Sequence, residues 1–323
     1  MKSTLLTGAF LALLTPAALQ AQRMDLPPAE KVIEALDNHP TVAAAAARVE
    51  AARAGRTMLA KGTHEVTVSG SYIRRTVDRE GGYDEFDSTV SRAFRLPGKA
   101  ALDRKAGTLG VEVAENRRDD VRHQAALTLS TLWHDWLTAG SLYRSDTNTV
   151  GVLEAALAAV RRRVQLRDAS QLELDQASAA LDLARAQAEA SRASEEQARV
   201  TLAATFPELP LPLEPPELAL PELPSPGLEA MRGLVIERSH EIGAADREAQ
   251  RLDVVARRAR ADRIADPSLG VRLFSERSGM EQGAGLVMSI PIGGGYRRAA
   301  EGQALAEAKA GRLELANVER MVT

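Results

Sequence analysis

Residues 66–72 are Val-Thr-Val-Ser-Gly-Ser-Tyr, and residues 267–273, about 200 positions later, are Pro-Ser-Leu-Gly-Val-Arg-Leu. Apolar and small or polar side chains alternate in both stretches, which predicts two half-buried β-strands. A similar helical opening precedes each stretch, Asn-His-Pro at 38–40 and Ser-His-Glu at 239–241. A repeat of this length is too long for a solenoid unit. We therefore interpret the chain as two large halves, each with the order helix, strand, strand, helix.

Each predicted strand has a partner across a loop that contains glycine. The first half has strands near 65–77 and 85–96, and the second has strands near 268–276 and 283–292. Two strands around such a loop predict a β-hairpin. Turn residues follow each hairpin, and they are Leu96, Pro97 and Gly98 in the first half and Pro291, Gly293 and Gly294 in the second. The glycines predict turns rather than a phosphate cradle, because no lysine or distal acid accompanies them.

The segment after the first hairpin predicts a long helical hairpin over residues 98–206. Apolar residues recur at steps of three and four from Val121 to Val164, the spacing of a coiled-coil seam. A continuous helix from 98 to 165 would be about 100 Å long, more than a compact domain needs. The pattern breaks near 165–171, where Ser170 is a suitable N-cap for the returning helix. This break is the predicted tip of the helical hairpin.

The remaining boundaries follow from composition. Residues 1–21 have the charged start, short apolar stretch and small final residue of a secretory signal peptide. Residues 22–206 form the first repeat. Eight of the fifteen prolines lie in the predicted linker, residues 207–227, which favours extended chain. Residues 228–323 form the second repeat, which begins with a predicted helix over 228–264. We expect this repeat to be incomplete because it stops before a second helical hairpin.

Composition also excludes several functions. The chain has no cysteine, so it has neither disulfides nor thiolate metal sites. Its net charge of −3 does not indicate a nucleic-acid partner. The five histidines are not at metal-ligand spacing. No nucleophile motif or acid–base cluster is present, so we expect no catalytic residue, no cofactor and no resident metal ion.

The most specific local pattern lies around the predicted tip. Arg163, Ser170, Leu172, Leu174 and Ala177 match a family pattern of Arg, three residues, Gly, two residues, Ser, one residue, Leu-Asp-Leu, two residues and Ala. Glu173 stands in for the family's Asp, and Arg167 occupies its Gly position. With the two hairpin exits and the repeated order of elements, the chain resembles the TolC-like outer-membrane efflux proteins, especially their heavy-metal and multidrug efflux branch.

The resemblance implies a mainly α fold with membrane β-strands. Each subunit of a homotrimer gives two β-hairpins to a twelve-stranded barrel among outer-membrane lipids, and its long helical hairpins build a periplasmic α-barrel. The tip docks on a periplasmic adaptor, or membrane fusion protein, that links the channel to an inner-membrane pump of the RND type or a related type. The residues that the resemblance places at this docking tip are Arg163, Val164, Leu166, Arg167, Asp168, Ser170 and Leu172.

The resemblance thus implies a conduit for exported substrates, with no reaction catalysed. A second possibility is a periplasmic coiled-coil scaffold or adaptor of the envelope. Adaptors usually carry a small β-domain between their helices, whereas this chain has two separate hairpins with polar loops, which favours the channel. A third is a truncated family member that does not conduct.

Overall fold

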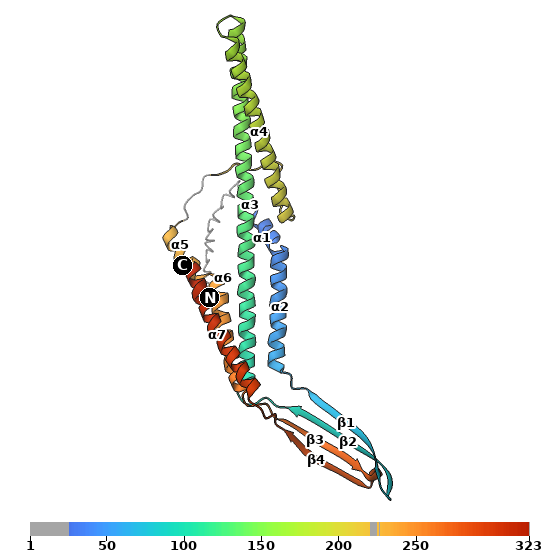
Figure 1. Ribbon diagram of the computed structural model, residues 1–323. Coiled ribbons are helices and arrows are strands. Elements are labelled where there is room, and N and C mark those ends of the chain that lie inside the picture. The colour runs from blue at the N-terminus through green and yellow to red at the C-terminus, as the bar shows by residue number, and fades with distance from the viewer. Residues whose placement is uncertain (1–25, 220–224, 226, 323) are drawn as a thin grey trace, which may run out of the picture. The chain divides into compact units, whose positions relative to one another are not determined.

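The computed structural model describes residues 26–219, 225 and 227–322 (Figure 1). The predicted signal peptide and residues 220–224 and 226 of the predicted linker lie outside this part. The chain forms two compact units, residues 1–35 with 130–221 and residues 36–129 with 222–323. The elements, in chain order, are α1 (Ala29–Asp37), α2 (Pro40–Lys61), β1 (Val66–Val77), β2 (Gly81–Ala93), α3 (Lys99–Gln165), α4 (Gln171–Thr205), α5 (Leu228–Glu237), α6 (His240–Ala261), β3 (Ser268–Glu276), the short 3-10 turn η1 (Arg277–Gly279), β4 (Glu281–Ser289) and α7 (Gly295–Val322).

The first unit is a helical hairpin. Helix α4 returns along the last part of α3 in the opposite direction (Figure 1). The predicted seam residues of α3, from Val150 to Val164, are half-buried or buried, and the matching stripe of α4 is centred on the buried Leu181. Farther from the tip, Trp136 is fully buried and its indole N–H donates to Glu195 Oε1 at 2.7 Å. Apolar seams therefore hold the two helices together, and polar contacts such as Trp136–Glu195 and Ser191–Asp146 add to them.

The second unit contains the sheet. Its four strands lie in the order β1-β2-β3-β4, and every neighbouring pair is antiparallel. The two hairpins are joined through β2 and β3, which come from different halves of the chain. Strands β1 and β4 are the edges. No described strand pairs with the outer side of either edge.

Helices α6 and α7 of this unit lie side by side (Figure 1). Ala256, Ala304 and Ala308 form one buried cluster between them. At Gly311 a Cβ atom would lie 2.7 Å from Leu252 Cδ1, so the helices approach at a point without a side chain. A second cluster of Ala106, Leu109 and Val254 packs α3 against α6. Small residues bring helix backbones close, which suits a thin wall of helices.

The predicted fold class, long helices with two β-hairpins, is confirmed. Three boundaries differ from the expectation. Strand β2 covers 81–93 rather than 85–96, because Gly81 and Gly82 pair with the end of β1. Strand β4 covers 281–289 rather than 283–292, since it loses its partner before Pro291. The helix expected over 228–264 is two helices, and Ser239 starts the second by accepting from the Ile242 N–H at 3.2 Å.

Within the described residues, no helix combines the length and the apolar composition that crossing a bilayer requires.

Candidate functional site

The sheet has two chemically different faces. Directly opposed residues of antiparallel strands point to the same side, and side chains alternate along each strand. One row across all four strands is therefore Val68, Val90, Val271 and Leu286, and every member faces the same side. These side chains are exposed, Leu286 by 91%. The same face carries further exposed apolar side chains, namely Val66, Tyr72, Phe86, Leu269, Leu273 and Met288.

The opposite face of the sheet is mainly polar, although it also carries Ile73, Phe274 and Val287. The same register places there the hydroxyl and charged side chains Thr67, Ser69, Ser71, Arg75, Glu85, Asp87, Thr89 and Arg272. Both faces are open to solvent in the single chain. A soluble sheet buries its apolar face against other protein. This sheet instead leaves a broad apolar face uncovered, which is the pattern of strands that contact lipid on one side and water on the other.

The tip of the helical hairpin is a short closed turn between Gln165 and Gln171. The Asp168 N–H donates to Arg163 O at 2.9 Å, and the Arg167 N–H donates to Val164 O at 3.0 Å. Arg167 has φ 63°, a left-handed conformation that glycine adopts without strain. The arginine at the family's glycine position thus takes the backbone conformation that glycine favours.

Ion pairs and a capping box fix the start of α4. Arg163 Nε lies 3.1 Å from Asp168 Oδ2, and its Nη1 lies 3.7 Å from Glu173. Ser170 accepts from the Glu173 N–H while Glu173 accepts from the Ser170 N–H, which satisfies two helix-end donors. The sequence motif therefore has a local structural role in addition to any docking role.

The structure places the seven predicted tip residues in three settings. Arg163, Asp168 and Ser170 are tied together by the contacts above. Leu166 and Leu172 project into solvent, with exposed fractions of 67% and 65%, and the Arg167 side chain is exposed. Val164 is half-buried in the seam, so it contributes to helix packing more than to the outer surface. Glu173 belongs to the cluster but was not among the predicted site residues.

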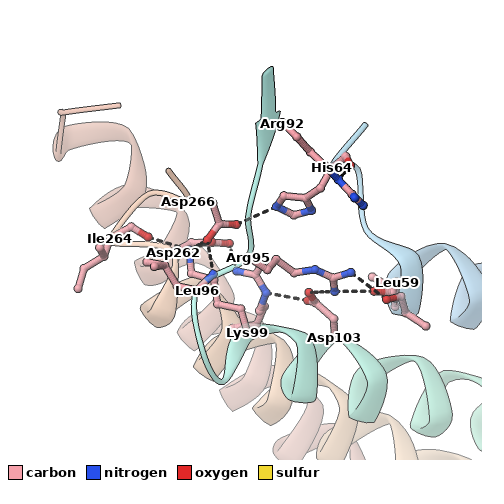
Figure 2. Close-up of polar contacts among 12 residues, drawn as sticks. Leu59, His64, Arg92, Arg95, Leu96, Lys99, Asp103, Asp262, Ile264 and Asp266 are labelled. Carbon is pink, nitrogen blue, oxygen red and sulfur yellow. Dashed lines mark hydrogen bonds and ion pairs between the residues drawn. The ribbon is translucent and has the colours of Figure 1, made fainter. Parts of the chain in front are cut away.

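A buried lysine lies at the first residue of α3, beside the exit of the first hairpin (Figure 2). The Lys99 side chain is only 2% exposed. Its Nζ donates to Asp266 Oδ1 at 2.8 Å and to Ile264 O at 2.7 Å, and it lies 3.0 Å from Asp262 Oδ1. Both aspartates come from the segment between α6 and β3. Lys99 therefore ties the first hairpin's exit to the second hairpin's entry.

Arg95 makes the corresponding connection to the entry of the first hairpin (Figure 2). It donates to Leu59 O and Ala60 O, carbonyls at the end of α2, and forms an ion pair with Asp103 at 2.8 Å. Its guanidinium passes over Gly62, where a Cβ atom would lie 2.4 Å from Nη2. Arg258 of α6 donates to the same Asp103 at 2.7 Å. We call the set His64, Arg95, Lys99, Asp103, Arg258, Asp262 and Asp266 the junction network.

Asp266 joins several of these contacts. It accepts from the Leu96 N–H at 3.0 Å, and His64 Nε2 lies 3.2 Å from its other oxygen. Burial alone would raise the pKa of this carboxyl, but the hydrogen bonds from Lys99, Leu96 and His64 outweigh that effect and hold the pKa below its ordinary value. Burial likewise opposes ionisation of Asp262, and hydrogen bonds from Arg258 and Lys99 lower its pKa overall. Both carboxylates are charged at neutral pH.

The predicted hairpin exits differ in structure. Leu96, Pro97 and Gly98 form a tight turn into α3, and Gly98 has φ 87°, which favours glycine. Pro291, Gly293 and Gly294 form an irregular segment before α7, and Arg298 Nε donates to Gly294 O at 3.2 Å. The first exit contacts the junction network through Leu96. Beyond the second exit, Arg297 of α7 donates to Asp262 O at 2.8 Å. Among the described residues, no three His, Asp or Glu side chains gather in a way that could hold a metal ion.

Comparison with solved structures identifies this architecture. The outer-membrane channel OprN matches with a TM-score of 0.75 at 20% identity, over 91% of this chain and 70% of that one. CusC, whose structures address transmembrane channel formation, matches with a TM-score of 0.71 at 17% identity, over 91% of this chain and 71% of that one. The outer membrane protein VceC of Vibrio cholerae matches with a TM-score of 0.71 at 16% identity, over 90% and 75%.

No protein-family model matches the sequence, and a search of curated proteins also finds no match. At these levels of identity, likeness to solved structures establishes the fold. The chain therefore has the TolC-like fold of the outer-membrane channels, the fold that its sequence resembles.

Proposed function

We propose that this chain is the outer-membrane channel component of a tripartite efflux system and works as a homotrimer. The single observation that carries the proposal is the amphipathic four-stranded sheet with two unpaired edges, in a chain with the outer-membrane channel fold. The channel conducts exported substrates from a periplasmic adaptor and its inner-membrane pump to the exterior.

The unpaired edges support an oligomer. In a bilayer, an unpaired backbone N–H or C=O costs several kcal/mol, so an open four-stranded sheet is not stable there. Pairing β4 of one copy with β1 of the next removes every edge, and three copies give twelve strands. Each strand has at least nine residues, close to the 9–11 that a tilted membrane strand needs.

The two faces support the orientation of such a barrel. Lipid-facing and lumen-facing residues alternate in membrane strands. The row of Val68, Val90, Val271 and Leu286 suits contact with lipid, and the hydroxyl-rich opposite face suits a wet lumen. The junction network then lies just beyond the helix-side ends of the strands, outside the hydrocarbon. A buried ion-pair network is far less costly there than within lipid.

The helical tip supports docking on the adaptor. Leu166 and Leu172 are apolar side chains left exposed on an otherwise capped and ion-paired turn. Arg167 holds an exposed cation in a strained conformation, and such strain is common at functional sites. A small apolar surface with a charged rim is typical of a protein-binding site.

Purified protein tests the channel proposal. Trimers that dissociate on heating in detergent, together with ion conductance in planar bilayers, are the expected results. A monomer that shows no conductance would contradict the channel and favour a periplasmic scaffold.

Two tip variants test docking separately. Arg163→Glu breaks the ion pairs with Asp168 and Glu173, and Ser170→Trp replaces the cap with a bulky side chain. Both should abolish export by cells that carry the cognate adaptor and pump, while the trimer still assembles and conducts. Arg192→Glu is the matched control, because Arg192 is exposed on α4 away from the tip and pairs with Glu189 at 3.6 Å. Unchanged export in both tip variants would remove the docking role.

A further inference from the structure

The polar face of the sheet carries a pair of opposite charges that bridges the two halves of the chain. Arg272 Nε of β3 donates to Asp87 Oδ2 of β2 at 2.6 Å. The same guanidinium lies over the ring of Phe274, 5.4 Å from its centroid. A second pair on this face, Arg75 Nη2 and Glu85 Oε1, lies at 2.7 Å and joins β1 to β2.

The Asp87–Arg272 pair is the charged pair nearest the helices on this face. From Asp87 toward the helix-side ends of β1 and β2, the other face positions carry the hydroxyls Ser71, Ser69, Thr67, Thr89 and Ser91. On β3 and β4, both fully described, the positions of this face between Arg272 and the helix-side ends of the strands carry small or apolar residues. An ion that moves along this face from the helix side therefore crosses a long neutral stretch before it reaches Asp87 and Arg272, the first fixed charges on the face.

Neighbouring residues leave room around the pair. Gly285 is opposite Arg272 on β4, and a Cβ atom added there would meet nothing within 4 Å. The Phe274 ring covers the next glycine, Gly283, where a Cβ atom would lie 2.4 Å from Cζ. Strand β4 thus supplies no charged partner at this level. The contacts with Asp87 and Phe274 therefore hold the guanidinium of Arg272 on the polar face of the sheet.

The whole polar face has more carboxylates than guanidiniums. The carboxylates along the strands are Glu85, Asp87, Glu276 and Glu281, and the guanidiniums are Arg75 and Arg272. Fixed charges that line a pore select ions of the opposite sign. The excess of carboxylates favours cations, and the guanidinium of Arg272 offsets part of that preference.

We propose that the fixed charges of the polar face give the pore a net preference for cations, and that Asp87 and Arg272 adjust the strength of this preference. This inference rests on the proposed channel function, because it requires the polar face to line the lumen. Arg272 neutralises the charge of Asp87 and also holds its side chain on the polar face. Removing either member leaves an unpaired charge, repeated in every subunit, at the same level of the pore.

Reversal potentials in planar bilayers under a KCl gradient test this directly. The wild-type trimer should prefer potassium over chloride. Arg272→Gln should raise the potassium-to-chloride permeability ratio, and Asp87→Asn should lower it, each by about two- to tenfold. The double variant Asp87→Arg with Arg272→Asp keeps both charges at this level and should return the ratio close to the wild-type value.

A pair on the opposite face provides the matched control. Arg74 Nη1 lies 3.4 Å from Asp84 Oδ1, and the register places both residues on the apolar face. Arg74→Gln removes the same charge as Arg272→Gln and should leave the reversal potential unchanged.

Each outcome separates the two proposals. Conducting trimers whose ratio stays the same in Asp87→Asn and Arg272→Gln would overturn the selectivity role and leave the channel intact. A wild-type preference for chloride would overturn the predicted sign. Wild-type protein without conductance would overturn the channel itself, and this inference with it. The charge-swapped double variant covers the case in which a single variant fails to assemble.

Discussion

Lys99 shows how one residue fixes the direction of a hairpin relative to its helices. A buried ammonium is costly unless charged partners and hydrogen bonds surround it. Lys99 has two carboxylates and one carbonyl within 3.0 Å, all from the segment that leads into β3. The contacts are specific in direction, so the start of α3 and the entry to β3 adopt one relative position.

Lys99→Met should lower the free energy of unfolding by about 3 kcal/mol, because it removes the ammonium group from both Asp262 and Asp266. This is the lower end of the range for a broken buried pair, since Asp262 is partly exposed and keeps a guanidinium partner, Arg258. Urea unfolding followed by circular dichroism measures the change. Lys105→Met removes an exposed lysine of the same helix and should change stability by less than about 0.5 kcal/mol. Equal effects of the two substitutions would contradict the role of Lys99.

The lowered carboxyl pKa values predict how this difference depends on pH. A carboxyl whose folded pKa lies below its ordinary value of 3.8 stabilises the fold above that value, and the contribution is lost as pH falls through the folded pKa. The wild type should therefore lose stability below about pH 4, where these groups take up protons. In Lys99→Met both aspartates have already lost the ammonium group of Lys99. The stability gap between the two proteins should narrow between neutral pH and pH 3, and a constant gap would contradict this assignment.

The sequence contains no local pattern for the junction network. Lys99 and Asp266 are far apart in the chain, as are Asp103 and Arg258, and an isolated lysine or aspartate has no periodicity that reveals its partner. The tip is different, because its residues are close in sequence and interact through local backbone geometry. Ser170 was therefore recognisable as the N-cap of a helix, whereas the structure adds Glu173 as its partner in a capping box. The left-handed backbone at Arg167 was indicated only by the glycine of the family pattern.

At the scale of elements, alternation identified all four strands but misplaced two of their ends. Gly81 and Gly82 have the composition of a loop, yet pairing with β1 extends β2 through them. Ile290 and Ile292 continue the apolar alternation of β4, but Pro291 has no N–H to donate and no described strand pairs beyond Ser289. Side-chain patterns thus predict the faces of a strand, and backbone partners determine its length.

The close approach of α6 and α7 depends on a missing side chain. Gly311→Val should cost about 2 kcal/mol, because its Cβ would lie 2.7 Å from Leu252 Cδ1 and 3.5 Å from Ala249 Cα. Gly302→Val introduces the same side chain in the same helix, where nothing lies within 4 Å, and it should not destabilise the fold. Thermal unfolding of both variants makes the comparison. A similar loss in both would contradict the role of the close approach at Gly311.

At the scale of the whole molecule, one chain has an incomplete sheet. The backbone groups on the outer sides of β1 and β4 are strong donors and acceptors, and their obvious partners are each other in neighbouring copies. Strands β1 and β4 lie at opposite ends of the strand order. The β4 edge of one copy can therefore pair with the β1 edge of the next, and successive copies can join head to tail into a ring. Closure of the ring defines the number of subunits.

Disulfide cross-linking tests that closure, and the absence of native cysteine makes every introduced thiol unique. Val68→Cys on β1, combined in turn with Ala284→Cys, Leu286→Cys or Met288→Cys on β4, places thiols on the same face of both edges. A disulfide needs Cβ atoms about 3.5–4.5 Å apart, so one combination should link copies covalently and give a trimer on non-reducing gels after boiling. Val68→Cys with Val271→Cys should not link copies, because β3 is an interior strand of the same row. Each single cysteine variant should also run as a monomer. If no combination links copies of a protein that still conducts, β1 and β4 do not meet and the barrel closes by another pairing.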